Sequence, residues 1–160
     1  MSETQAIDIS NTESKGSPRT EPAKPKGKTP GIATSSDFVR IAILGMTPAG
    51  ETFAEHMLEK IQLEERPIRI VAVADPNPDH PVMLGFQYNN TEVFTDYLDV
   101  AKMAEDIDII FDMTNDRLLT QKLRLELLER KNRHTIIASE QVARLVWIFF
   151  NEDTDLLGKK

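Results

Sequence analysis

The stretch "RIAILGMTPAGETFAEHMLEK", residues 40–60, predicts a strand, a tight turn and a helix in immediate succession. The run up to Leu44 is apolar and β-branched, which is typical of a strand covered on both faces. Beyond the turn, Phe53, Met57 and Ile61 recur every four residues and form one apolar stripe of a helix. A strand that leads through a glycine turn into an amphipathic helix is a building unit of layered α/β domains.

The same alternation continues along the chain. Strands are expected at residues 39–44, 68–74, 92–94, 107–113 and 134–139. Helical patterns lie between them, and short crossovers between parallel strands are right-handed. We therefore predict an α/β fold of three layers, a Rossmann-like domain with a five-stranded parallel sheet in the order 3-2-1-4-5. In such a sheet, ligands bind at the carboxyl ends of the central strands.

The composition shifts at the start of this domain. Residues 1–36 contain four of the nine prolines and almost no large apolar side chains, so burial cannot offset the entropy of ordering them. We predict a disordered tail at 1–36, one globular domain at 37–151 and a polar C-terminal tail at 152–160. A chain of 160 residues with 40% hydrophobic content has material for one core of this kind.

Composition also limits the chemistry. The chain has no cysteine, which excludes disulfides, thiolate metal sites and a cysteine nucleophile. The three histidines lack metal-ligand spacing, so no metal is expected. Past residue 36 the chain holds 14 basic and 22 acidic groups, so nucleic acid is not an expected partner. No apolar stretch reaches the length of a membrane span, and we expect a cytoplasmic protein without membrane contact.

The turn "GMTPAG" carries two of the three glycines of a phosphate-binding turn. Gly45 can make the tight bend, and Gly50 can let the helix pack closely on the strand. Thr47 stands where the middle glycine would admit phosphates, and Pro48 has no N–H to donate. Phosphate binding would rely on the N–H groups of Ala49, Gly50 and their neighbours, with the Thr47 hydroxyl as a further donor. The alternative is a ligand-free helix start in which Thr47 is the N-cap.

Asp75 directly follows the second predicted strand. An acidic side chain at this place commonly binds the adenosine ribose of NAD and would repel the 2′-phosphate of NADP. The alternative is a simple Asp-Pro turn, because "DPNPDHP" is rich in helix and strand breakers. Since Gly45, Gly50 and Asp75 all fall in the expected places, the sequence favours a nucleotide ligand, with NAD as the candidate cofactor.

Carboxylates also gather around the fourth predicted strand. Asp112 ends that strand beside the expected crevice, and we interpret it as a polar strand end. Asp116 or Asn115 is expected to cap the helix that follows.

Five segments together resemble a known family. They are "RIAILGMTPAG", "IRIVAVADPNPD", "EVFTDYLDVAK", "DIDIIFDMTND" and "HTIIASEQVAR". Over residues 38–145 the chain resembles the N-terminal NAD(P)-binding domain of the glucose-fructose oxidoreductase and inositol dehydrogenase family. The resemblance implies that Asp75 and Pro76 line the adenosine end, and that Thr114 and Asn115 lie over the cofactor. The candidate cofactor-binding residues are Gly45, Met46, Thr47, Ala49, Gly50, Asp75, Pro76, Thr114 and Asn115.

The departures from this family concern catalysis. After its fifth strand the family has a Glu-Lys-Pro motif whose lysine serves substrate binding and proton transfer, whereas this chain has Glu140, Gln141 and Val142. A neutral amide cannot replace that lysine. The sequence also ends about where the family's substrate domain, with its catalytic histidine, would begin. We therefore assign no catalytic residue and do not expect hydride transfer by this chain alone.

The ending "ASEQVARLVWIFFNE" resembles small stand-alone or sensor-linked bacterial Rossmann domains that accompany signalling proteins. This helical pattern is apolar on more than one face. We expect Val142, Leu145, Val146 and Phe149 to face the sheet, and Trp147, Ile148 and Phe150 to point elsewhere. An extra apolar face on so small a domain indicates a partner surface.

The leading hypothesis is a non-catalytic NAD(H)- or nucleotide-binding module with a regulatory or sensory role. It would act through a homodimer or a partner protein that contacts the helix at 140–150. The alternatives are a ligand-free protein-interaction domain and an oxidoreductase subunit that another chain completes.

Overall fold

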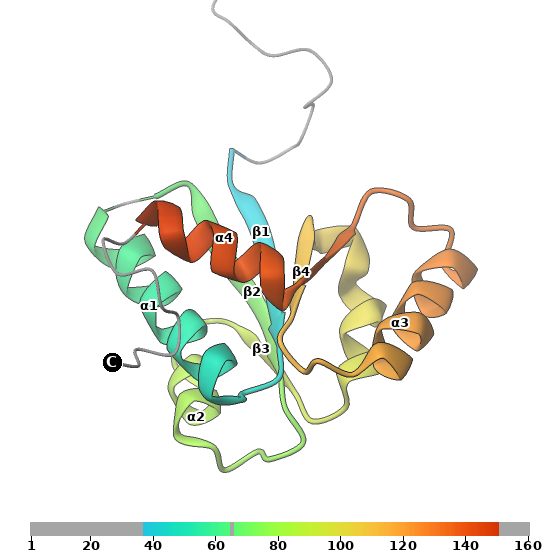
Figure 1. Ribbon diagram of the computed structural model, residues 1–160, viewed down its shortest axis with the longest axis horizontal. Helices are drawn as coiled ribbons and strands as arrows, with labels where there is room; N and C mark the ends of the chain where they lie inside the picture. Colours follow the sequence, from blue (N-terminus) through green and yellow to red (C-terminus); the bar gives the residue numbers. More distant parts are fainter. Residues whose placement is uncertain (1–36, 65, 151–160) are drawn as a thin grey trace, which may run out of the picture. The chain divides into compact units, whose positions relative to one another are not determined.

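The computed structural model describes residues 37–64 and 66–150, and the predicted tails at 1–36 and 152–160 lie outside these ranges. Strands and helices alternate along the described part of the chain (Figure 1). The strands are β1 (Val39–Leu44), β2 (Ile68–Ala74), β3 (Glu92–Phe94), β4 (Ile109–Asp112) and β5 (Ile136–Ser139). The helices are α1 (Pro48–Glu64), α2 (Pro81–Gln87), the 3₁₀ helix η2 (Tyr97–Asp106), α3 (Arg117–Glu129) and α4 (Glu140–Phe150).

The five strands form one parallel sheet in the order β3-β2-β1-β4-β5. This order was predicted from the sequence, and it confirms the Rossmann-like α/β fold. Leu44 is paired with Ala74 of β2 and with Asp112 of β4, so the central strands end at the same edge. From β1, the first half of the chain adds strands β2 and β3 on one side, and the second half adds β4 and β5 on the other side. In such sheets a ligand crevice can open at the carboxyl ends of the strands where the direction changes, here beside β1 and β4.

Helices cover both faces of the sheet. Residues of α1, α2 and α4 share one apolar cluster with Ile41 and Ile43 of β1. Residues of η2 and α3 share the other cluster with Ala42 and Leu44. Successive residues of β1 therefore point to opposite layers, which explains why its sequence is apolar throughout.

The expected strands and helices differ from the observed ones mainly at their ends. The predicted strand at 107–113 is shortened to Ile109–Asp112, because the Ile107 N–H donates to the Ala104 carbonyl and caps η2. Asp116 caps α3, accepting hydrogen bonds from the N–H groups of Leu118 and Leu119. Among the helices that the structure describes, none is long and apolar enough to cross a membrane.

Helix α4 faces the domain with a different side from the one expected. The inward residues are Ala143, which is fully buried, with Val146, Trp147 and Phe150 packed against the core. The outward residues are Val142, Leu145, Ile148 and Phe149. The prediction was therefore wrong for Val142, Leu145, Phe149, Trp147 and Phe150.

The inward side of α4 contacts α1 and the segment between α1 and β2. The Trp147 ring lies 4.7 Å from the His56 ring, centroid to centroid. The Arg66 guanidinium lies 5.6 Å from the centre of the Phe150 ring. Both stripes of α4 are apolar, so periodicity cannot choose between them; the inward stripe is the one whose Trp147 ring contacts α1 and whose Phe150 ring contacts Arg66.

Candidate functional site

The turn between β1 and α1 needs glycine at two positions for steric reasons. Gly45 has φ of 91°, and a Cβ there would lie 2.8 Å from the Thr114 Cγ2 atom. A Cβ on Gly50 would lie 1.9 Å from the Gly45 carbonyl oxygen. The first turn of α1 therefore sits directly against the end of β1, and the loop after β4 lies over the turn.

Thr47 connects the turn to two neighbours through its hydroxyl. The oxygen accepts a hydrogen bond from the Gly50 N–H (3.1 Å), as an N-cap does, and the hydroxyl donates to the Met113 carbonyl (3.2 Å). The Thr47 carbonyl also accepts the Glu51 N–H at 2.7 Å. The sequence predicts the Thr47 hydroxyl and the Gly50 N–H as hydrogen-bond donors to a phosphate, but in the structure they are hydrogen-bonded to each other.

Two other N–H groups of the turn differ from that of Gly50. Within residues 37–64 and 66–150, the N–H groups of Thr47 and Ala49 donate to no protein atom. Both lie at the N-terminus of α1, where the helix dipole favours an anion. The turn therefore keeps two donors beside a helix N-terminus, in a place where Pro48 supplies none.

Asp75 lies at the end of β2 and contacts the turn directly. Its Oδ2 atom accepts the Met46 N–H at 2.7 Å, and its Oδ1 atom accepts the Asn77 N–H at 2.9 Å. A carboxylate has about four acceptor positions. Asp75 is therefore oriented by two backbone donors and keeps acceptor capacity for further hydroxyl groups. Pro76, next to it, is exposed.

The buried carboxylate of Asp112 organises the loop after β4. Its Oδ1 atom accepts the Thr114 N–H (3.0 Å) and the Thr114 hydroxyl (2.6 Å). Its Oδ2 atom accepts the Thr120 hydroxyl at 2.6 Å. The loop after β4 and helix α3 supply all of these donors. Asp112 is therefore a polar strand end, and its hydrogen bonds hold Thr114 in place over Gly45.

Asn115 and Glu140 join the loop after β4 to the start of α4. Asn115 has φ of 60°, and its side-chain amide donates to Glu140 Oε2 at 2.5 Å. The buried Glu140 accepts two hydrogen bonds from Arg144 at Oε1, at 2.8 and 3.0 Å. Asn115 thus points toward α4 rather than toward the turn. Gln141, at the position of the family's lysine, is exposed.

Tyr97 lies close to this edge, although no motif in the sequence singled it out. Burial, together with the smaller effect of the negative charges of Asp75, Asp112 and Asp116, raises the pKa of Tyr97 to about 12. Its phenol is therefore protonated at neutral pH and can donate a hydrogen bond. The only signal in the sequence is topological, since Tyr97 follows β3, whose carboxyl end lies beside that of β2.

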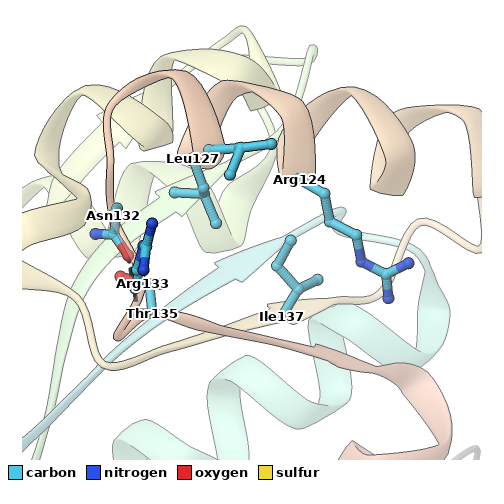
Figure 2. A pocket seen from close by; sticks show the side chains of 7 residues that line it. Arg124, Leu127, Asn132, Arg133, Thr135 and Ile137 are labelled. Atoms are coloured by element: carbon cyan, nitrogen blue, oxygen red, sulfur yellow. Dashed lines mark hydrogen bonds between the residues drawn. The ribbon is translucent and has the colours of Figure 1, made fainter.

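Two hollows lie elsewhere on the domain. One, of about 390 Å³, is bordered by Leu58, Ile61 and Ile68, between α1 and the start of β2. The other, of about 300 Å³, lies between α3 and β5 (Figure 2). Neither is lined by the turn residues. Among the described residues, no group of three or more histidine, aspartate or glutamate side chains could hold a metal ion.

The fold and this edge define the class: a Rossmann-like α/β domain whose glycine turn, β2 carboxylate and β4 loop meet at the carboxyl ends of the strands. No protein-family model matches the chain, and no curated protein matches it. Solved structures do match. Homoserine dehydrogenase of S. aureus matches with a TM-score of 0.50 and 17% identity, over 74% of this chain and 31% of that one.

Two further solved structures match with lower TM-scores. Scyllo-inositol dehydrogenase of Lactobacillus casei, with bound NAD(H) and scyllo-inositol, has a TM-score of 0.44 and 21% identity, over 62% of this chain and 27% of that one. A homoserine dehydrogenase of Thiobacillus denitrificans has a TM-score of 0.45 and 18% identity, over 68% and 25%. The chain spans less than a third of each of these proteins. At these identities, the likeness to the S. aureus enzyme shows a shared fold.

Proposed function

We propose that this chain is a non-catalytic module that binds NAD(H) or a related nucleotide at the carboxyl edge of β1 and β2. The observation that carries the proposal is the contact between Asp75 and the Met46 N–H, 2.7 Å long, across a turn that requires both of its glycines. A carboxylate fixed at the end of β2, beside a helix N-terminus, offers one acceptor for a ribose and a positive dipole end for phosphates.

Different groups of the proposed site would contact the ribose and the pyrophosphate of the nucleotide. Asp75 would accept the hydroxyl groups of the adenosine ribose, with Pro76 beside it, and the free N–H groups of Thr47 and Ala49 would face the pyrophosphate. Thr114 and the Tyr97 phenol lie next to the same edge. The Asp75 charge disfavours a 2′-phosphate, so the proposal includes a preference for NAD over NADP.

The non-catalytic part of the proposal rests on the start of α4. The family's lysine is replaced by Gln141, an exposed neutral amide that can neither carry a positive charge nor exchange a proton at neutral pH.

A cytoplasmic location also belongs to the proposal, because a cysteine-free chain has no need of an oxidising compartment.

The regulatory part of the proposal rests on α4, which we assign to a contact with a second copy of the chain. Its outer side presents Val142, Leu145, Ile148 and Phe149, the last with 80% of its surface exposed. Residues 145–150 contain no charged side chain, so two copies of the helix can meet without bringing like charges together. The Asn115–Glu140 hydrogen bond connects this helix to the loop that covers Gly45.

Calorimetric titration with NAD, NADH, NADP and ADP-ribose tests the ligand. We expect NAD and ADP-ribose to bind, and NADP to bind more weakly. Asp75→Ala should weaken NAD binding by about 10- to 100-fold, the value of one or two hydrogen bonds to a charged acceptor. Asp79→Asn is the matched control, because it removes one negative charge from the same loop at a position whose side chain makes no hydrogen bond to a described residue.

A ligand-free interaction domain is the second candidate, and the Thr47 hydroxyl supports it. That hydroxyl already satisfies the Gly50 N–H, which a phosphate would otherwise take. Absence of heat and of any thermal shift with all four nucleotides would rule out the first candidate and leave this one.

A further inference from the structure

The segment formed by α3 and the loop after it has the opposite charge from the rest of the chain. Residues 117–134 hold six arginines and lysines against two glutamates, a net charge of +4. The whole chain has a net charge of −7, which leaves −11 for all other residues. The six cations are Arg117, Lys122, Arg124, Arg130, Lys131 and Arg133, and all are exposed. Most of this excess comes from Arg130, Lys131 and Arg133 after the helix, so the segment 117–134 as a whole attracts negative partners that the rest of the chain repels.

Apolar side chains lie among these cations. Helix α3 buries Leu119, Leu123 and Leu127 against the sheet. It also exposes a second set of leucines, Leu118, Leu125 and Leu128, each with 59–64% of its surface in solvent. Exposed leucines between arginines are typical of a surface that binds a partner with both charge and apolar groups.

The hollow between α3 and β5 lies within this surface. Figure 2 shows Leu127 and Ile137 between Arg124 at one end and Arg133 at the other, with Asn132 and Thr135 beside Arg133. Its volume is about 300 Å³. Neither arginine forms an ion pair with a described residue, whereas Arg40, Arg66, Arg130 and Arg144 each have an acidic partner. The hollow therefore has an apolar floor between two cations that are available to a ligand.

We propose that the surface of α3 and β5 is a docking site for an acidic peptide segment of another protein, with one apolar side chain seated in the hollow. The charge contrast selects an acidic partner, and the apolar floor selects a side chain such as leucine between its acidic residues. The hollow opens at the side of the domain formed by the end of α3 and the start of β5, away from the glycine turn. This proposal is therefore independent of nucleotide binding.

The geometry favours a peptide over two other acidic partners. A membrane surface would meet the exposed leucines, but it would not reach Leu127, which is only 5% exposed. A second copy of this chain would have to place an acidic face elsewhere on its surface against α3. Unless that contact is reciprocal it is head-to-tail and does not close into a dimer, whereas a short peptide needs only this one surface.

Fluorescence anisotropy with labelled peptides tests the proposal on the full chain. The probe is a nine-residue peptide of alternating glutamate and aspartate with leucine at its centre, and the reference peptide has serine there. We expect the leucine peptide to bind several-fold more tightly than the serine peptide, and salt to weaken both. The double variant Arg124→Glu/Arg133→Glu should weaken the leucine peptide by about tenfold or more.

The matched control is Arg117→Glu/Lys122→Glu, which makes the same charge change on α3 outside the hollow. It should weaken the leucine peptide less than threefold, since only the general field changes. Equal losses for both double variants, or equal affinity for the two peptides, would overturn the proposal. So would binding to phosphatidylserine vesicles without binding to the leucine peptide. Circular dichroism of each variant verifies that it is folded.

Discussion

Gly45 and Gly50 are required by the protein's own packing, whether or not a nucleotide binds. The Gly45 carbonyl occupies the space that a Cβ on Gly50 would need, and Thr114 occupies the space beside Gly45. A glycine pair of this kind is therefore evidence for the strand-turn-helix geometry. Evidence for a ligand has to come from other groups, here Asp75 and the free N–H groups of the turn.

Alanine substitutions at two glycines should differ sharply in stability. Gly50→Ala places a Cβ 1.9 Å from a backbone oxygen that cannot move without displacing β1, and we expect a loss of about 3 kcal/mol or more. Gly85→Ala, inside α2, meets nothing within 4 Å and should be stabilising by about 0.5–1 kcal/mol. Urea unfolding of both variants measures the difference, and equal effects would contradict the packing described for the turn.

At the scale of residues, the sequence predicts local roles better than distant ones. The N-cap role of Thr47 and the need for Gly50 follow from spacing within one turn. Asp112 and Glu140 also have partners from other elements, Thr120 and Asn115 respectively, and only the folded chain brings these together. Their assembly depends on the register between strands, and one sequence does not contain that information directly.

At the scale of elements, a partly buried ion pair joins Arg40 of β1 to Asp108, the residue before β4. Arg40 donates to Asp108 through Nη2 (2.9 Å), Nε (3.2 Å) and its backbone N–H (2.8 Å). The hydrogen bond from Arg40 holds the pKa of Asp108 below its usual range, and the same contact raises the pKa of Arg40. Since β1 is the central strand, this pair holds the crossover connection from η2 against the sheet.

The stability of this contact should depend on pH with a definite sign. Because the pKa of Asp108 is lower in the folded than in the unfolded chain, its contribution is fully present above the unfolded value of about 3.9. It is lost as the pH falls through the lower folded value. Asp108→Asn should therefore cost about 1–2 kcal/mol near pH 6, with the difference from wild type shrinking toward pH 3.

Unfolding in urea at a series of pH values measures this difference. Asp106→Asn is the control, since Asp106 lies 3.6 Å from Arg40 and its side chain is 73% exposed. Its effect should be small at every pH. A constant difference between Asp108→Asn and wild type from pH 6 to pH 3 would refute the assignment.

Helix α4 shows what periodicity at the scale of elements can and cannot supply. The apolar pattern correctly predicts a helix over residues 140–150, and it correctly predicts that one apolar side is left over. It assigns the wrong side to the core, because Val142, Leu145 and Phe149 are as apolar as Val146, Trp147 and Phe150. The side that faces the core is the one whose Trp147 and Phe150 rings contact His56 and Arg66, and hydrophobicity alone does not distinguish the two sides.

At the scale of the whole molecule, the exposed apolar side of α4, with Leu145, Ile148 and Phe149, predicts that the chain forms a dimer. In analytical ultracentrifugation, the chain should sediment with twice its mass of 18.1 kDa, and Phe149→Glu should shift it toward the monomer. Leu63→Glu is the matched control, because Leu63 is 77% exposed on α1 and lies outside this side of α4. A wild-type monomer at about 100 μM, far above a micromolar Kd, would rule out self-association through α4.

The whole fold was more accessible to prediction than the site. Strand order and layering follow from the alternation of strands and helices together with the handedness of crossovers, so the sequence alone predicts the order of the sheet. The positive segment at residues 117–134 is also visible in the sequence, although the acidic residues elsewhere in the domain outweigh it in the net charge.

The Thr47 hydroxyl has a consequence for the state of the protein when its turn is empty. By capping Gly50 and donating to the Met113 carbonyl, it completes the first turn of α1 with no outside molecule. The unliganded chain is then an ordered species in its own right. A phosphate that took over the Gly50 N–H would exchange one hydrogen bond for another, with little net gain from that donor. The affinity of the turn for a phosphate would then have to come from the N–H groups of Thr47 and Ala49 and not from that of Gly50.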